Sequence, residues 1–80
     1  MTTQILTPVE LAVRRLGRMT PTEERMARLV QQGLRNRQIA EHLHYSPRSV
    51  EVYLSRIYHK LGISSRLELA RALDAAEVRS

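Results

Sequence analysis

Apolar residues recur every three or four positions along most of this 80-residue chain. The longest such stripe lies within residues 47–61 and consists of Val50, Leu54, Ile57 and Leu61. This spacing places the four side chains on one side of an α-helix, the side that a folded domain buries. No segment alternates polar and apolar residues for long enough to predict a β-strand. The pattern therefore predicts an all-α fold.

Residues that start and stop helices divide the chain into five predicted helices. Hydroxyl or amide residues that can cap a first turn are Thr7, Thr20, Asn36, Ser46 and Ser65. A glutamate follows three positions after the first, second and last of these, as in a capping box. Gly33 and Gly62 suit left-handed C-terminal caps. The predicted helices cover residues 8–16, 21–32, 37–43, 47–61 and 66–77.

The third and fourth predicted helices have the proportions of a helix-turn-helix. A short helix is followed by the turn His44-Tyr45-Ser46 and then by a longer helix. Ala40 is small where the two helices would cross, and we expect Tyr45 to fill the turn as an apolar plug. Other helical hairpins share this spacing, so the outer face of the longer helix decides the interpretation.

The outer face of helix 47–61 mixes cations, small polar groups and one valine. At about 100° per residue, the side opposite the apolar stripe collects Arg48, Val52, Ser55, Arg56 and His59, with Ser49 and Glu51 on its flanks. Arginine donates to guanine edges or phosphates, and valine contacts thymine methyl groups. An ordinary solvated face would show a similar mixture. Residues 46–66, however, hold four cationic residues against one anionic residue, which favours a polyanionic partner.

Composition narrows the chemistry further. The formal net charge is +5, which fits a nucleic-acid partner as well as a merely soluble surface. Cysteine is absent, so disulfides and thiolate metal ligands are excluded. His42, His44 and His59 have no clustered carboxylates beside them, and we expect no metal site. Without a glycine-rich phosphate loop or a nucleophile–base pair, we predict no enzymatic activity and no cofactor.

Four sequence blocks carry a resemblance to a known family. They are Met19-Thr20-Pro21-Thr22-Glu23, Gly33-Leu34-Arg35-Asn36-Arg37-Gln38-Ile39-Ala40, Ser46-Pro47-Arg48-Ser49-Val50-Glu51-Val52-Tyr53-Leu54 and Lys60-Leu61-Gly62-Ile63-Ser64-Ser65-Arg66. Their order and spacing resemble the LuxR-type (GerE-type) helix-turn-helix domain of bacterial transcription regulators. The resemblance implies a tetrahelical domain (residues 20–77), with its third helix in the major groove of double-stranded DNA and its fourth helix used for dimerisation. We therefore divide the chain into an extension (1–18) and a DNA-binding domain (19–77).

The resemblance also assigns roles to single positions. Those that face bases are Glu51, Val52, Ser55 and Arg56. Those that face phosphates are Asn36, Arg37, Ser46, Arg48, Ser49 and Lys60. Glu23 is structural, with Arg66 as its expected ion-pair partner. One copy would read only a few base pairs, so we expect a homodimer on paired half-sites, and RNA polymerase as a further partner.

The extension has a pattern of its own. Leu6, Val9, Val13 and Leu16 form an apolar stripe on an additional N-terminal helix. A short free helix is marginal in water, so this one should pack on the domain or on a second copy. The alternative is a linker that trails from a regulatory domain. Neither a signal peptide nor a membrane span is visible, so we expect a cytoplasmic chain without a membrane partner.

Two alternative functions remain open. A protein–protein interaction module could use the same fold to bind another regulator through Val52, Tyr53 and the stripe between Leu6 and Leu16. Such an apolar interface would depend little on salt, whereas DNA binding would weaken steeply as salt rises. RNA binding is less well supported, because the outer face lacks exposed aromatic residues for stacking on unpaired bases.

Overall fold

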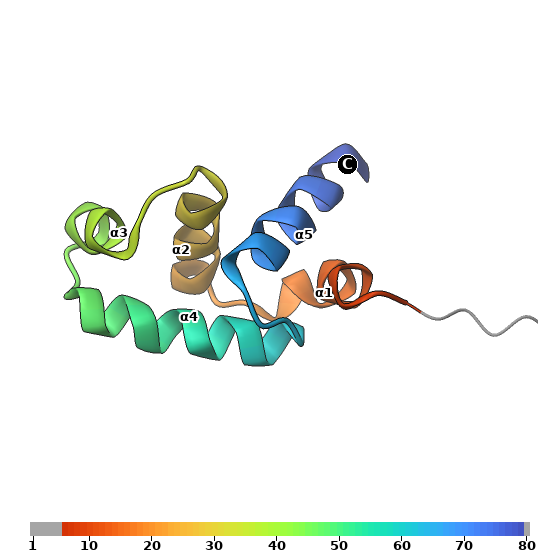
Figure 1. Cartoon of the computed structure of the whole chain (residues 1–80), viewed down its shortest axis with the longest axis horizontal. Coiled ribbons are helices and arrows are strands. Elements are labelled where there is room, and N and C mark those ends of the chain that lie inside the picture. Colours follow the sequence, from red (N-terminus) through yellow and green to blue (C-terminus); the bar gives the residue numbers. More distant parts are fainter. Residues whose placement is uncertain (1–5, 80) are drawn as a thin grey trace, which may run out of the picture.

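The computed structural model describes residues 6–79, and all regular structure in that range is helical. The elements are α1 (Pro8–Arg15), the 3₁₀ turn η1 (Leu16–Arg18), α2 (Pro21–Gln31), α3 (Asn36–Leu43), α4 (Pro47–Leu61) and α5 (Arg66–Arg79). Each predicted helix is present, and its ends lie within two residues of the predicted ends. The prediction of an all-α, helix-turn-helix fold is confirmed. In Figure 1, α4 runs along one edge, with α3 and α2 above its N-terminal half and α1 and α5 near its C-terminal end.

Helix starts mostly follow the predicted capping chemistry. The side chains of Thr7, Thr20 and Ser46 each accept a hydrogen bond from the backbone N–H three residues later, at 3.1, 3.2 and 3.1 Å. The prediction that Asn36 caps the third helix is wrong. Asn36 is the first residue of α3, and the Gln38 side chain accepts a hydrogen bond from the Arg35 N–H at 2.8 Å. The Asn36 side-chain oxygen is occupied instead by the Arg66 guanidinium.

The chain reverses direction at three left-handed residues. Gly33 and Gly62 have φ angles of 91° and 75°, as their positions predicted. The third is His44, with φ 61°, which ends α3 and starts the turn toward α4. The next backbone N–H, from Tyr45, donates to the Ala40 carbonyl at 2.8 Å. Because no glycine marks this position, its left-handed backbone conformation could not be predicted from the sequence.

The apolar stripe of α4 forms the centre of the core. Val50, Leu54, Ile57 and Leu61 are all buried, as predicted. Ala40 of α3 is buried, α3 packs on α4, and α2 packs against both α4 and α5. Helix α4 is therefore supported along its inner side, and its outer side is left at the surface.

The additional N-terminal helix is part of this packed body. Helix α1 contacts α5 and α4, and Val9, Val13 and Leu16 pack half-buried against the core. Three of the four stripe residues thus pack on the domain, which is one of the two arrangements expected for this helix. The stripe missed Ala12, the one fully buried residue of α1, because an alanine adds little to an apolar pattern.

Candidate nucleic-acid interface

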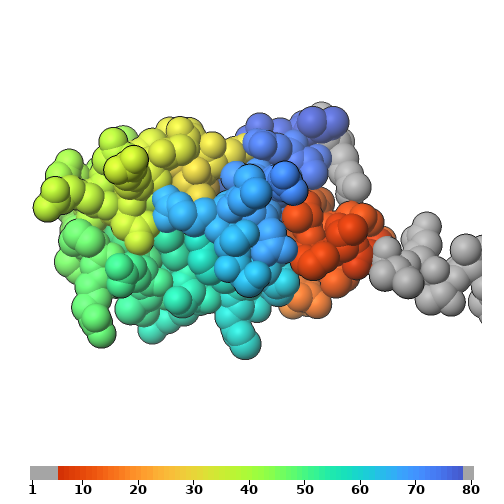
Figure 2. Space-filling model, in the orientation of Figure 1, coloured from red at the N-terminus to blue at the C-terminus, as the bar shows by residue number. Residues whose placement is uncertain are grey.

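Helix α4 presents an uninterrupted outer face. Arg48, Val52, Ser55, Arg56 and His59 are all exposed on the side opposite the buried stripe, and Glu51 is exposed on its flank. Val52 is 45% exposed, so this face carries one accessible aliphatic side chain among its polar residues. The four predicted base-facing residues are therefore all accessible. Figure 2 shows side chains of α4, in green to teal, projecting from the lower edge of the molecule.

The predicted phosphate-facing residues divide into two groups. Arg37, Arg48 and Ser49 lie in the first turns of α3 and α4, and Ser46 is the N-cap of α4; among the described residues, these four donate no hydrogen bond to another helix. The Ser46 hydroxyl donates to the Ser49 hydroxyl at 2.9 Å and accepts from the Ser49 N–H at 3.1 Å. The start of α4 thus combines backbone N–H groups, two hydroxyls and an exposed arginine, which is a suitable environment for a phosphate.

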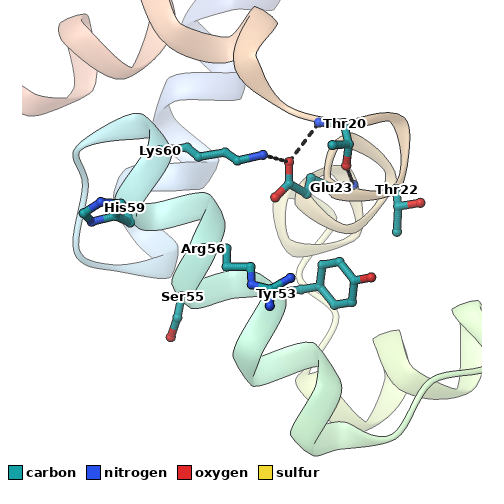
Figure 3. Close-up of a pocket in the computed structure, with 8 residues that line it drawn as sticks. All are labelled: Thr20, Thr22, Glu23, Tyr53, Ser55, Arg56, His59 and Lys60. Atoms are coloured by element: carbon teal, nitrogen blue, oxygen red, sulfur yellow. Dashed lines mark hydrogen bonds and ion pairs between the residues drawn. The ribbon is translucent and has the colours of Figure 1, made fainter.

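Lys60 belongs to the second group, because it already holds a partner inside the domain. Its Nζ donates to Oε1 of Glu23 at 2.6 Å (Figure 3). The Glu23 side chain is 4% exposed and that of Lys60 is 36% exposed. The expectation that Arg66 pairs with Glu23 is therefore wrong. Lys60 in the last turn of α4 reaches the first turn of α2, where Glu23 lies.

Glu23 is buried as a charged group. Burial alone raises its pKa, but the hydrogen bond from Lys60, the backbone N–H of Thr20 and the Lys60 charge together hold the pKa below its ordinary value. The Thr20 N–H donates to Oε1 of Glu23 at 2.8 Å, so one carboxylate caps α2 and binds α4. The prediction that Glu23 is structural agrees with these contacts.

Arg66 fixes a different junction. Its guanidinium donates to the side-chain oxygen of Asn36 and to the backbone carbonyl of Leu34. The start of α5 is thereby tied to the loop before α3. Burial raises the pKa of the nearby Tyr58 above its ordinary value, and the charge of Arg66 opposes this effect only in part. Asn36, a predicted phosphate contact, thus has its oxygen committed within the domain and keeps only its amide N–H donors.

Two tyrosines and an arginine form a row on the surface that the sequence analysis did not foresee. The rings of Tyr45 and Tyr53 stack with centroids 5.6 Å apart and planes inclined by 14°. The guanidinium carbon of Arg56 lies 5.8 Å from the centroid of the Tyr53 ring. Tyr45 is 37% exposed, so the prediction that it plugs the turn is wrong. Its ring lies against Tyr53 because the left-handed His44 turns the chain toward α4.

The row borders a shallow groove between α4 and the first turn of α2. The groove is lined by Thr20, Thr22, Glu23, Tyr53, Ser55, Arg56, His59 and Lys60 (Figure 3). Within residues 6–79, no three histidine or acidic side chains gather in a way that could hold a metal ion. No helix in the same range is long and apolar enough to cross a membrane.

Comparison with known proteins agrees with this geometry. Residues 18–73 match the family of bacterial regulatory proteins known as the LuxR family. An HTH-type transcriptional regulator of Mycobacterium bovis is 49% identical over 53 residues, which is 66% of this chain and 6% of that protein. The response regulator Rre1 of Synechocystis sp. is 50% identical over 52 residues, 65% of this chain and 22% of that protein. The transcriptional regulatory protein UhpA of Escherichia coli is 37% identical over 71 residues, 85% of this chain and 36% of that protein.

The chain therefore spans between about one-sixteenth and about one-third of the length of these relatives. No solved structure matches it. The family match covers all of α2, α3 and α4 and the first half of α5, but leaves α1 outside. On this match, the chain belongs to the LuxR family of bacterial regulatory proteins.

Proposed function

We propose that this chain binds double-stranded DNA in a sequence-specific manner, as a transcription regulator or as the effector domain of one. The observation that carries the proposal is the outer face of α4, which is exposed along its length while the inner face is buried. A helix of this kind, preceded by a short helix and a tight turn, fits the major groove. The relatives named as transcriptional and response regulators support the same function.

Base reading is assigned to four exposed residues of α4, which are Glu51, Val52, Ser55 and Arg56. The Arg56 guanidinium can donate to O6 and N7 of guanine, and Glu51 can accept from N4 of cytosine. Val52 offers methyl groups to the methyl group of thymine. These contacts would differ between sequences, whereas contacts to phosphates would not.

Phosphate contacts are assigned to the first turns of α3 and α4 and to Lys60. Arg37, Arg48 and Ser49 keep side-chain donors available, whereas the Ser46 hydroxyl donates to Ser49 and caps α4 beside them. Lys60 uses one of its three N–H donors on Glu23, and Asn36 uses its oxygen on Arg66. For these two residues we propose a double role, in which the same side chain fixes a helix junction and turns its remaining donors to the backbone of DNA.

Two copies on paired half-sites would supply the specificity that one short recognition helix lacks. Helix α5 carries two exposed apolar residues, Leu67 and Val78, that could contribute to such a homodimer. RNA polymerase is the further partner that a regulator of transcription would contact, and the proposed location is the cytoplasm.

The competing protein–protein function loses part of its surface in this structure. Its interface would have used the stripe from Leu6 to Leu16, but Val9, Val13 and Leu16 pack against the core of the same chain. Val52 remains exposed, and Tyr53 is half-buried and covered in part by Tyr45. Two apolar side chains cover far less than the roughly 800 Å² per partner that a stable protein interface buries.

Fluorescence anisotropy with a labelled random-sequence duplex, measured at low and at moderate salt, tests the proposal. We expect binding that weakens steeply with salt, because phosphate neutralisation releases counterions. A site selected from a random pool should then bind more tightly than the starting pool. If the folded protein binds no duplex at low salt, or if binding is independent of salt, the DNA-binding function is refuted.

Single substitutions test the division of labour. Arg48→Ala should weaken binding to all duplexes alike, whereas Val52→Ala and Arg56→Ala should change the preferred sequence. Arg71→Ala is the matched control, because Arg71 is an exposed arginine of α5. Equal and sequence-independent losses from the first three variants would contradict the assigned roles.

A further inference from the structure

The row formed by Tyr45, Tyr53 and Arg56 has features that core packing does not require. The core beneath α4 is already filled by the buried stripe of the helix. Tyr45 lies at the surface, and its ring stacks on the Tyr53 ring and is not buried in the core. The Arg56 guanidinium lies over the Tyr53 ring, in the range in which a cation is attracted to an aromatic face.

The position of this row on α4 connects it to the proposed base-reading face. Tyr53 and Arg56 are three residues apart, so they are neighbours on the helix surface. Tyr53 lies between the buried stripe and the outer face, and Arg56 lies at the edge of the outer face. Both residues line the groove beside α2 and also a second hollow, formed with Ser46, Arg48, Ser49 and Val52. Arg56 thus lies between the two hollows. The Tyr53 ring beneath its guanidinium restricts the orientations that this side chain can adopt.

An arginine on a helix surface loses rotamer freedom when it makes a directed contact, and that loss weakens binding. A neighbouring ring that restricts the side chain beforehand reduces this loss. The planar guanidinium stacks on an aromatic face while its edge N–H groups stay available for hydrogen bonds. Stacking on Tyr53 is therefore compatible with a two-pronged contact to a guanine edge.

We propose that Tyr53, braced by Tyr45, is a positioning residue that holds the Arg56 guanidinium ready for base recognition and so sets how strongly Arg56 discriminates between base pairs. The proposal rests on the DNA-binding function proposed above. Tyr53 itself touches no base in this arrangement. It acts through Arg56, and the effect of changing it should appear only at the base pair that Arg56 reads.

A double-mutant cycle on the selected DNA site tests this. The base pair read by Arg56 is first identified as the one at which Arg56→Ala loses discrimination. Tyr53→Leu should then lose about two- to fivefold discrimination at that base pair and none at the others. In the Arg56→Ala background, Tyr53→Leu should cause no further loss of discrimination. Tyr53→Phe, which keeps the ring, should restore the discrimination.

Tyr58→Leu is the matched control, since Tyr58 is another half-buried tyrosine of α4 that packs against the core, and no arginine among the described residues lies over its ring. It should lower the melting temperature and leave discrimination at the Arg56 base pair intact. Tyr45→Leu serves as a second variant if Tyr53→Leu does not fold, because Tyr45 is exposed. It should show a smaller loss at the same base pair.

The outcomes separate the two proposals. Wild-type protein that selects no sequence refutes the DNA-reading function. Wild-type protein that selects a site, with Tyr53→Leu weakening all duplexes equally or adding its loss of discrimination to that of Arg56→Ala, refutes only the positioning role of Tyr53. Loss of discrimination at the Arg56 base pair alone, reversed by Tyr53→Phe, supports it.

Discussion

At the start of α2 and at the start of α5, a hydroxyl residue is followed three positions later by a glutamate. In both places the hydroxyl oxygen accepts the backbone N–H of the glutamate at 3.2 Å, Thr20 from Glu23 and Ser65 from Glu68. Both carboxylates also accept a backbone N–H, at 2.8 Å for Glu23 and 3.0 Å for Glu68. The hydrogen bonds that cap these two helices are therefore closely alike.

The surroundings of the two glutamates differ. Glu23 is buried and binds Lys60 of α4, whereas Glu68 is half-buried and, within residues 6–79, binds Ser64 and Ser65 in its own segment. The contact of Glu23 with Lys60 joins the start of α2 to the end of α4. Glu68 makes no such contact among the described residues and serves the start of its own helix. A capping signature in a sequence thus predicts where a helix starts, but not whether its acidic residue also joins two helices.

Removal of each carboxylate should give the largest difference in stability between the two helix starts. We expect Glu23→Ala to cost about 2–3 kcal/mol, because it strips Lys60 and the Thr20 N–H of their acceptor in a buried place. For a domain of this size the melting temperature should fall by roughly 10–20 °C. Glu68→Ala should give a clearly smaller fall. Thermal denaturation followed by circular dichroism checks both, and equal losses would show that burial of Glu23 adds nothing.

Removal of the ammonium group tests the link between helices from its other end. Lys60→Met keeps the aliphatic stem but leaves Glu23 with the Thr20 N–H as its charge-stabilising partner. We expect a loss of about 1–2 kcal/mol, since Lys60 is partly exposed and its ion pair is weakened by solvent. Arg71→Met on α5 removes the same charge and should be nearly neutral. Chemical denaturation measures the free energy of unfolding. An equal loss for Arg71→Met would mean that Lys60 stabilises the fold through net charge and not through its contact with Glu23.

The fold was accessible to sequence reasoning because its determinants are local. Caps, prolines and apolar spacing act within one or two turns, and they placed α2 and α4 almost to the residue. The exposed face of α4 followed from the same spacing, since burial of Val50 and Ile57 leaves Val52 and Arg56 outside.

The partners of the polar side chains were not accessible in the same way. Lys60 and Glu23 are 37 positions apart, and Arg66 and Asn36 are 30 apart, so their pairing depends on how helices cross. Sequence alone could not decide which cation reaches Glu23, and it selected the wrong one. The stacking of Tyr45 on Tyr53 depends in addition on the left-handed His44, which no glycine marks.

Removal of the two hydroxyl caps, unlike removal of the two carboxylates, should cause nearly equal losses of stability. Thr20→Ala and Ser65→Ala each remove one acceptor for a backbone N–H, and we expect each to cost about 1 kcal/mol. Thr20→Ser and Ser65→Thr keep the acceptor and should cost less. Denaturation of the four variants under identical conditions provides the measurement. A much larger loss for Thr20→Ala than for Ser65→Ala would mean that the hydroxyl, and not only the carboxylate, supports the contact between α2 and α4.

Acid titration should reveal the smallest difference between the two helix starts. The pKa of Glu23 and the pKa of Glu68 both lie below the ordinary value of 4.5 in the folded chain. Below that pH the unfolded chain takes up protons that the folded chain does not, so stability present above pH 4.5 is lost as the pH falls through the folded-state pKa values.

Glu23→Gln and Glu68→Gln should each reduce this loss of stability at low pH. Melting temperatures between pH 7 and about pH 3 would measure the reduction. Lys60→Met distinguishes the two glutamates. It should reduce the loss of stability at low pH by raising the pKa of Glu23, without changing the contribution of Glu68. Combined with Glu23→Gln, it should therefore cause no further reduction of the loss at low pH, whereas combined with Glu68→Gln the two reductions should add. Additivity in both combinations would mean that Lys60 acts on acid stability through net charge and not through the carboxylate of Glu23.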